Sequence, residues 1–336
     1  MKNRFAAFAA TLVLSGAVFA PPARATNSKP ELQAVMRDLL AWWPGEYDTL
    51  PQVELERQLG APPDGEHARQ YRVFARVSVP QIGDHVIYGE VHSGGKNGPL
   101  IKGQQVLYIV SIDEQHQAVN VSGRRIKDGQ NYEQAYLYPD KLKSIALDPA
   151  YGGNCDFRFR RYGHDLRGWL ADAGQGGTSC TMVSKMSGQT MTWVADWAIT
   201  PEQIWVSDNG YMKDPAKPDQ PGRLFAGRED LVPERLYKGQ NFSCIVSVHG
   251  TPMSQVRHVP LHDRGGEFDL QAMGIAGERV RLLRLPQPRA APQYLADVLT
   301  LAVLAADDKP IARATADANT ISVHWDRGHI DCRKEH

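Results

Sequence analysis

Residues 152–170 read GGNCDFRFRRYGHDLRGWL, and the middle of this stretch has the alternating pattern of a β-strand. A Gly-Gly turn leads into it. Successive side chains of a strand point to opposite faces, so each face has its own set of residues. The sets are Cys155, Phe157 and Phe159 on one face, and Asp156, Arg158 and Arg160 on the other. If the second face lines a barrel, its arginines could clamp the carboxylates of a ligand, and if it faces water, it is ordinary amphipathic patterning.

Short segments of the same kind recur along most of the chain. They are rich in aromatic or β-branched residues and are bounded by Gly, Asp, Asn or Pro, as is typical of strands. They cover residues 71–79, 85–91, 104–112, 118–123, 178–185, 189–197 and 203–207. Many short strands at regular spacing favour an all-β fold, an antiparallel sandwich or barrel, over alternating βαβ units.

Two segments have the spacing of helices. Residues 30–43 repeat apolar side chains every three or four positions, and Pro44-Gly45 ends this helix. A second helical stretch is expected within residues 131–147, broken or kinked at Pro139. The sequence therefore predicts a mostly β fold with minor helices.

The strand pattern restarts near the C-terminus and predicts a second unit. Strand-like segments there cover residues 242–249, 266–270, 278–285, 294–305, 311–314 and 320–325. A boundary near residue 240 divides the chain into a first unit over 26–240 and a small C-terminal β-rich domain over 241–336. Residues 212–222 contain three prolines and several charges, and we expect them to form a loop.

The first 25 residues have the features of a signal peptide. Two basic residues precede an apolar run over residues 5–20, and the Ala-Arg-Ala of 23–25 is a small-x-small cleavage pattern. We expect a mature chain that starts at Thr26 and is periplasmic or secreted. No later segment is apolar enough to span a bilayer. Lys+Arg and Asp+Glu both number 38, so no net charge points to nucleic acid or anionic lipid.

All four cysteines lie in the expected mature chain. An even number in an oxidising compartment favours two disulfides, and three pairings can be drawn. We favour Cys155–Cys180, because this pair brackets two strand-like segments joined by a turn-rich link. The remaining pair, Cys244–Cys332, would tie the two ends of the C-terminal segment together. No Cys-x-x-Cys occurs, so neither a redox motif nor a zinc knuckle is expected.

The common catalytic signatures do not occur in the sequence. There is no Gly-x-Ser-x-Gly, no His-Glu-x-x-His, and no Gly-x-Gly-x-x-Gly after a strand. No catalytic residue is therefore assigned, and nothing selects a metal site among the 11 histidines. Tyr88 and Glu90 share a strand face. They are either polar groups inside a barrel that could bind a ligand, or part of a cross-strand ion pair with a neighbouring arginine. Four tryptophans either wall a pocket or belong to the core: Trp169, Trp193, Trp197 and Trp205.

Taken together, these segments resemble the CpcT/CpeT family of phycobiliprotein chromophore lyases over residues 31–239. LLAWWPGEYDT is similar to the family's opening helix and strand, and VIYGEV at 86–91 is similar to its Tyr-x-Glu-Gln segment. GQQVLYIV at 103–110 resembles its Arg-Gln-Arg-Val strand, and NCDFRFRRYGHDLRGWL resembles its Gly-Cys-Asp segment. Cys180 falls at its second cysteine, and SDNG at 207–210 resembles its Asp-x-Gly turn. The order and spacing of the segments carry the likeness.

The resemblance implies an antiparallel β-barrel of the calycin, lipocalin-like class that forms a homodimer and holds an extended linear tetrapyrrole. It implies a lyase reaction in which a thiol of a phycobiliprotein subunit adds to a vinyl-type side chain of the bilin. No metal or other cofactor is required. Val91 and Gln105 depart from the family's Gln and Arg. The candidate ligand-binding residues are Tyr88, Glu90, Gln105, Asp156, Arg158, Arg160, Trp169 and Trp193.

Three functions of different classes follow from the sequence. The chain is a lyase acting on a bilin or a similar chromophore, an exported protein that binds a small amphipathic ligand without catalysis, or an interaction protein whose C-terminal domain is adhesive. We favour binding, because the sequence shows no dedicated acid, base or nucleophile. The expected disulfide removes Cys155 as a nucleophile.

Overall fold

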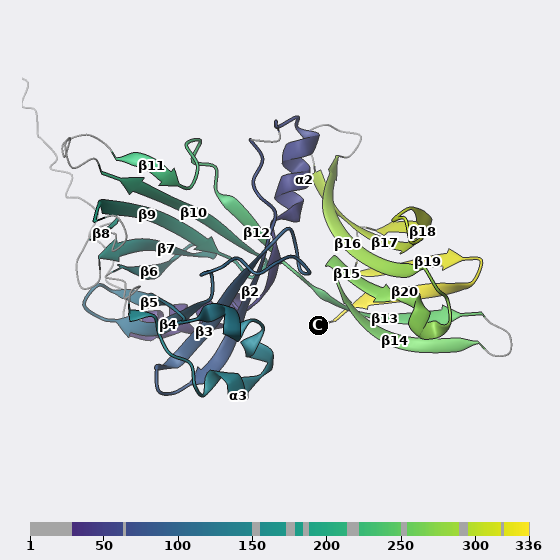
Figure 1. The fold of residues 1–336 in the computed structure, drawn as a ribbon, viewed down its shortest axis with the longest axis horizontal. Helices are drawn as coiled ribbons and strands as arrows, with labels where there is room; N and C mark the ends of the chain where they lie inside the picture. The colour runs from purple at the N-terminus through teal and green to yellow at the C-terminus, as the bar shows by residue number, and fades with distance from the viewer. Residues whose placement is uncertain are drawn as a thin grey trace, which may run out of the picture.

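A computed structural model describes residues 29–62, 65–149, 155–172, 179–183, 188–213, 222–249, 254–288, 295–316 and 319–335 of the chain. Strands make up 56% of the described residues and helices 15%, which confirms the all-β fold with minor helices. Two bodies lie next to each other in Figure 1, a barrel and a pair of smaller sheets. The expected signal peptide, residues 1–25, and most of the loop expected at 212–222 lie outside the described residues.

The first body is a closed barrel of ten antiparallel strands, which confirms the barrel over the sandwich that the strand pattern had left open. Each strand pairs with the next in the ring, and the last pairs with the first to close it. In ring order the strands are β10 (Gln203–Met212), β12 (Glu234–Lys238), β1 (Gly45–Asp48), β2 (Gln70–Val79), β3 (Gly83–Ser93), β4 (Val106–Asp113), β5 (Ala118–Arg125), β6 (Cys155–Tyr162), β7 (Asp165–Asp172) and β9 (Thr190–Ile199). Two short strands extend the sheet beside β9 and β10: β8 (Cys180–Val183) and β11 (Arg223–Ala226).

An aromatic core fills the part of the barrel lumen next to the first helix, α1 (Lys29–Trp42). Apolar residues of α1 recur every three or four positions and pack with the inward-facing residues of the strands. Trp43 follows the helix and is fully buried. Its ring centroid lies 4.8 to 6.1 Å from those of four other aromatic side chains: Phe74, Tyr108, Phe159 and Trp197.

The phenylalanines of β6 point into this core. Phe159 is fully buried, and the ring of Phe157 lies 4.8 Å from that of Trp197. Gly168 stands opposite Phe159 on β7. A Cβ at Gly168 would lie 2.5 Å from the ring of Phe159, so only glycine leaves room for this ring. The alternation of β6 therefore turns its phenylalanines inward and its charged residues outward.

Residues 129–147 cover the outside of β2, β3 and β4. They form three short helical pieces in place of the single helical stretch that the sequence predicted: η1 (Gly129–Tyr132), η2 (Ala135–Leu137) and α3 (Pro139–Leu142). Pro139 begins α3 and does not break a helix, because its fixed φ and missing N–H suit the first turn. Apolar residues from this cover and from the outer face of the strands form a core of their own.

Helix α2 (Leu50–Gln58) lies between the two bodies, where it contacts β12 and β16 (Figure 1). The sequence did not predict this helix, because its apolar residues are too few to mark a helical face. Its stability comes from packing against both bodies, which a local pattern does not record.

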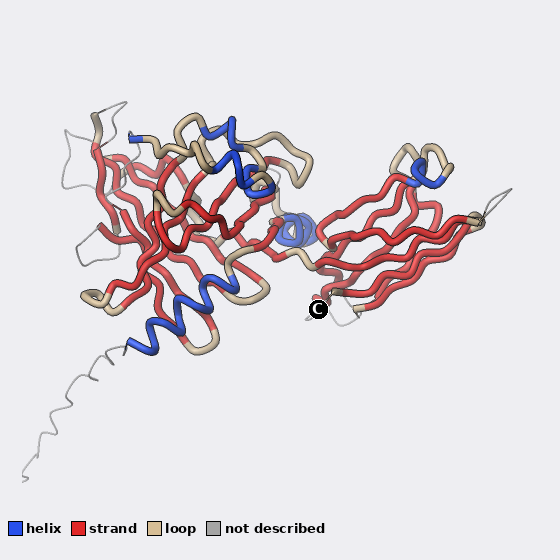
Figure 2. Tube along the Cα trace, turned by 90° about the horizontal axis from the view of Figure 1, so that it is seen from below, coloured by secondary structure: helices blue, strands red, loops and turns tan. Residues whose placement is uncertain are grey.

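The second body is a pair of four-stranded antiparallel sheets that share one apolar core. In pairing order, the first sheet is β14 (Gln255–His262), β13 (Asn241–Val248), β20 (Gly328–Lys334) and β19 (Thr320–Trp325). The second sheet is β15 (Arg264–Asp269), β16 (Arg279–Pro288), β17 (Leu295–Leu304) and β18 (Pro310–Ala316), with the short helix η4 (Leu270–Met273) after β15. Figure 2 shows the two sheets as one layered unit beside the barrel.

Both predicted disulfides are present, Cys155–Cys180 and Cys244–Cys332. The first joins the start of β6 to β8. The second joins directly opposite residues of β13 and β20, whose Cα atoms are 4.0 Å apart. Within the described ranges, no helix has both the length and the apolar character needed to cross a bilayer.

Candidate functional site

The barrel lumen opens into a cavity of about 500 Å³ beyond its aromatic core. A smaller cavity of about 180 Å³ reaches down to the rings of Tyr108 and Trp197. The two cavities share four lining residues: Gln70, Arg72, Gln104 and Asp208. We call the two cavities together the lumen pocket. Strands β2, β9, β10 and β12 supply half of the residues that line the larger cavity, so a strand from the start of the barrel meets three from its end at this site.

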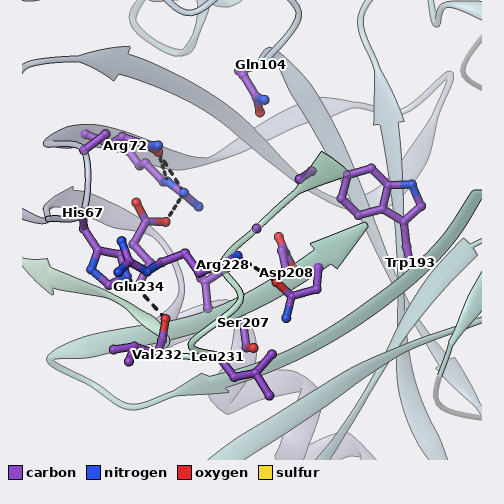
Figure 3. Close-up of a pocket in the computed structure, with 16 residues that line it drawn as sticks. His67, Arg72, Gln104, Trp193, Ser207, Asp208, Arg228, Leu231, Val232 and Glu234 are labelled. Carbon is purple, nitrogen blue, oxygen red and sulfur yellow. Dashed lines mark hydrogen bonds and ion pairs between the residues drawn. The ribbon is translucent and has the colours of Figure 1, made fainter. Parts of the chain in front are cut away.

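An ion pair between β2 and β12, the two strands that flank β1, crosses one side of the lumen pocket (Figure 3). The Arg72 guanidinium of β2 donates from Nη2 to Glu234 Oε2 of β12. The same guanidinium donates to Gln70 Oε1, with distances of 3.2 Å from Nε and 2.9 Å from Nη2. Both charged side chains are about 15% exposed (14% and 15%), so water screens the pair only partly.

Asp208 is the carboxylate of the lumen pocket that no cation neutralises directly. Its Oδ1 accepts a hydrogen bond of 2.9 Å from Trp197 Nε1, and no described residue donates to its Oδ2. Burial raises the pKa of Asp208 above its usual value, although the bond from Trp197 and the charge of Arg72 oppose this effect. Burial likewise raises the pKa of Tyr108 to about 12, so its hydroxyl stays neutral.

Aromatic and aliphatic side chains form the remaining wall. Trp193 lies across the pocket from the ion pair in Figure 3, and its ring meets that of Phe225 edge to face at 5.3 Å. Leu231 and Val232 stand at the mouth, with 59% and 42% of their surface exposed. The pocket thus combines an apolar rim with polar groups deeper inside, the arrangement typical of sites for amphipathic molecules.

The loop at the mouth is held by ionic contacts. Arg228 donates from Nε to Asp230 Oδ1 and from Nη2 to Oδ2, and this contact lowers the pKa of Asp230 to about 2. Helix α2 anchors the end of the loop, because Gln52 donates to the carbonyl of Pro233 at 3.1 Å. His67, which also lines the pocket, is fixed by Glu56 through both its backbone N–H and its ring. The wall is therefore formed before any ligand arrives.

Of the residues singled out in the sequence, Trp193 and Trp197 line the lumen pocket, and Glu90 borders its smaller cavity. Tyr88 and Glu90 point to the outer face of β3, beneath the cover formed by residues 129–147. Tyr88 donates to Glu90 at 2.7 Å, and the backbone N–H of Gln134 donates to the same carboxylate at 2.9 Å. Glu90 borders the smaller cavity, but its carboxylate serves to hold the cover in place.

Gln105 is fully buried outside the lumen pocket, next to Gly129 at the start of the cover. Its neighbour Gln104 is the residue that lines the pocket. Of these two neighbouring residues, Gln104 and not the candidate Gln105 therefore faces the pocket.

The charged face of β6 lies outside the barrel. Asp156 accepts from Ser122 at 2.6 Å and from Asn120 at 3.1 Å. Arg158 is 3% exposed, and its Nε is 3.8 Å from Asp113. Two of the candidate residues form a stacked pair on this outer surface, Arg160 and Trp169, with the guanidinium 4.9 Å from the ring. These side chains stabilise the outer surface and do not reach the lumen.

Three central residues of the lumen pocket were missed in the sequence: Arg72, Asp208 and Glu234. The alternation of QYRVF at 70–74 puts Gln70 and Arg72 on the face of Phe74, and this signal could have found them. Asp208 belongs to SDNG, which resembled a turn but lies inside the long strand β10. In the described part of the chain, no group of three or more His, Cys, Asp or Glu side chains is placed to hold a metal ion.

The fold and the site define an antiparallel β-barrel with a polar and aromatic pocket in its lumen, which is compatible with a ligand-binding barrel. No protein-family model matches the chain, and no curated protein matches it. Among solved structures, the chain is similar to the selenomethionine form of the CRL protein of Arabidopsis. The identity is 15% and the TM-score 0.40, over 63% of this chain and 98% of that one, and we draw no functional conclusion from this likeness.

Proposed function

We propose that the protein is an exported binding protein whose barrel holds a small amphipathic ligand in the lumen pocket. Linear tetrapyrroles are the first ligands to test, because the sequence resembles the CpcT/CpeT chromophore lyases. The role proposed for the barrel is to hold the ligand in one shape and one protonation state.

One observation supports this proposal most strongly: the lumen is apolar and filled on one side but polar and open on the other. Polar groups inside a barrel cost free energy unless they are paired, and a core that served only stability would not keep them. Asp208 nevertheless has a carboxylate oxygen that no described residue satisfies. The main cavity, about 500 Å³, is within the usual range of ligand sites.

The chemistry of the pocket suits a flat conjugated molecule with N–H groups and acidic arms. Trp193 and Trp197 offer ring surfaces against which such a molecule can pack. The free oxygen of Asp208 would accept from a ring N–H. Carboxylate arms would meet the positive charges of Arg72, deeper in the pocket, and of Arg228, on the loop at the mouth.

Binding is proposed in preference to covalent chemistry on this chain. All four cysteines are paired in disulfides, so the chain has no free thiol to form an adduct with a ligand. In a lyase reaction, the thiol would have to come from the acceptor protein. The two disulfides also support export to an oxidising compartment, the periplasm or the exterior. N-terminal sequencing of the exported protein would test cleavage after Ala25.

A spectroscopic titration tests the proposal. The mature chain from Thr26 is mixed with biliverdin or phycocyanobilin, and absorption and circular dichroism are recorded in the visible range. Binding in a fixed shape predicts a red shift and an induced circular dichroism signal that saturates at one ligand per chain. The urea-unfolded protein is the control. Spectra that stay identical to those of the free bilin at a tenfold protein excess would contradict the proposal.

A further inference from the structure

A second cavity, of about 230 Å³, lies where the barrel meets the C-terminal sheets. We call it the junction cavity. The starts of β1 and β13 and the ends of β12 and β14 enclose it, so both bodies contribute to its wall. Its lining residues are Gly45, Glu46, Lys238, Gly239, Asn241 and His262. None of them lines the lumen pocket.

His262 lines this cavity, and one of its ring nitrogens is buried with no hydrogen-bond partner among the described residues. The side chain is 8% exposed, and its Nδ1 accepts a bond of 3.1 Å from the backbone N–H of Arg264. In the neutral ring the proton must therefore sit on Nε2. The Nε2 atom is buried, has no hydrogen-bond partner, and lies 3.6 Å from Glu46 Oε2. It is a donor that still needs an acceptor.

The surroundings keep this ring neutral. Burial lowers the pKa of His262, and the nearby charge of Lys96 lowers it further. The carboxylates of Glu46, Asp263 and Asp48 act in the opposite direction but do not outweigh these two effects. The ring thus offers an N–H to the cavity at neutral pH.

Glu46 supplies an acceptor on the same wall. Its Oε2 receives bonds from Tyr71 and, at 2.9 Å, from Lys96, while no described residue donates to its Oε1. Burial would raise its pKa, but the bond from Tyr71 and the charge of Lys96 prevail and lower it. The carboxylate is therefore ionised, neutralised by Lys96, and open at one oxygen.

Lys238 adds a positive charge to the cavity. Its stem crosses Gly45, where a Cβ would lie 2.4 Å from the lysine Cε, so glycine is needed at that position. The ammonium donates one bond of 2.8 Å, to the carbonyl of Trp42, and no described carboxylate lies within ion-pair distance of it. Since Glu46 is balanced by Lys96, the only carboxylate charge that acts on Lys238 among the described residues is that of Glu202, which is not within ion-pair distance.

We propose that the junction cavity binds a small 2-hydroxy- or 2-amino-carboxylate. The carboxylate of the ligand accepts from His262 Nε2–H and faces the ammonium of Lys238. The hydroxyl or ammonium group on the adjacent carbon donates to Glu46 Oε1. A site of this size holds only a few non-hydrogen atoms beyond these groups, because one water already fills about 30 Å³ in the liquid. Such a ligand would join barrel and sandwich, so its binding would also stabilise their contact.

Calorimetric titration of the mature protein tests this inference. We expect heat of binding and a rise in melting temperature with lactate and L-serine, and at least tenfold weaker binding of acetate and of glycerol. Acetate lacks the donor for Glu46, and glycerol lacks the negative charge. If neither lactate nor L-serine binds at concentrations up to 10 mM, on the order of the weakest affinities of small ligands, the proposal is wrong. Acetate binding as tightly as lactate would refute the role of Glu46.

Two variants locate the site. His262→Phe keeps an aromatic ring beside Tyr71 but removes the donor, and Lys238→Met keeps the stem over Gly45 but removes the charge. Each is expected to weaken lactate binding at least tenfold, and Lys238→Met decides the matter if His262→Phe does not fold. His258→Phe, on the exposed face of the same strand, is the matched control and should bind lactate like the wild type. Unchanged lactate binding in Lys238→Met would overturn the proposal.

Discussion

Asp208→Asn separates the stability of the barrel from its capacity to bind. Burial raises the pKa of Asp208, so the charged carboxylate is less favourable in the folded protein than in the unfolded chain. Asparagine has nearly the same shape, and its carbonyl can still accept the 2.9 Å bond from Trp197 Nε1. The variant removes the charge and little else. We therefore expect it to be more stable than the wild type and less able to bind a ligand.

The expected gain is modest. Relief of an unfavourable burial of this kind is worth about 1–3 kcal/mol, and part of it is lost with the attraction between Asp208 and Arg72. A net gain of about 1 kcal/mol in the free energy of unfolding would raise the melting temperature by about 2–4 °C. A charged hydrogen bond to a ligand contributes about 1.5–3 kcal/mol. Its loss weakens binding by at least about tenfold.

The pH dependence gives the sharper test. An acid with a raised pKa in the folded state stabilises the protein most when it is protonated, and this stability is lost as the pH rises from the unfolded value of 3.8 through the folded one. The advantage of Asp208→Asn should therefore be full at pH 7 and shrink as the pH falls toward 4. Urea unfolding at a series of pH values measures it. A variant less stable than the wild type at pH 7 would refute the reasoning.

Two further predictions concern the fold. Replacing Cys244 and Cys332 by serine should lower the free energy of unfolding by about 4.6 kcal/mol, and replacing Cys155 and Cys180 should lower it by about 3.5 kcal/mol. The first loss is larger because that disulfide closes a longer loop, with a sequence separation of 88 residues against 25. Urea unfolding of the two double variants would show the opposite order if loop length were not decisive. Trp43→Ala should cost about 3–5 kcal/mol, because the indole contacts four aromatic rings; a loss below about 1 kcal/mol in thermal melting would mean that the core closes around the gap.

Much of the fold could be predicted from local pattern. The helix over residues 30–43 and most barrel strands could be predicted, because the periodic spacing of their apolar residues holds along the whole segment. Strands β14 and β20 were missed, because Pro260 interrupts the first and charged residues alternate through the second. Helix α2 was missed because contacts with two bodies, and not its own sequence, keep it folded.

The site was harder to predict, because alternation assigns residues to two faces but does not say which face is inside. For the arginines of β6 and for the Tyr88–Glu90 pair the sequence left open whether they face the lumen, and in the structure both lie outside the barrel. A distant segment, residues 129–147, turns the outer face of β3 into a second core. Burial and polarity on that face therefore resemble those of a binding site, although they serve to hold the cover.

The most direct test of the lumen pocket compares two double variants in the same bilin titration. Arg72→Met with Asp208→Asn changes the pocket, whereas Arg158→Ala with Arg160→Ala changes only the outer surface of β6. We predict that the first variant loses the induced circular dichroism signal at ligand concentrations that saturate the wild type. The second should keep the signal and melt at a lower temperature, because Arg160 stacks on Trp169 and Arg158 is buried. Loss of the signal in the second variant alone would contradict the account.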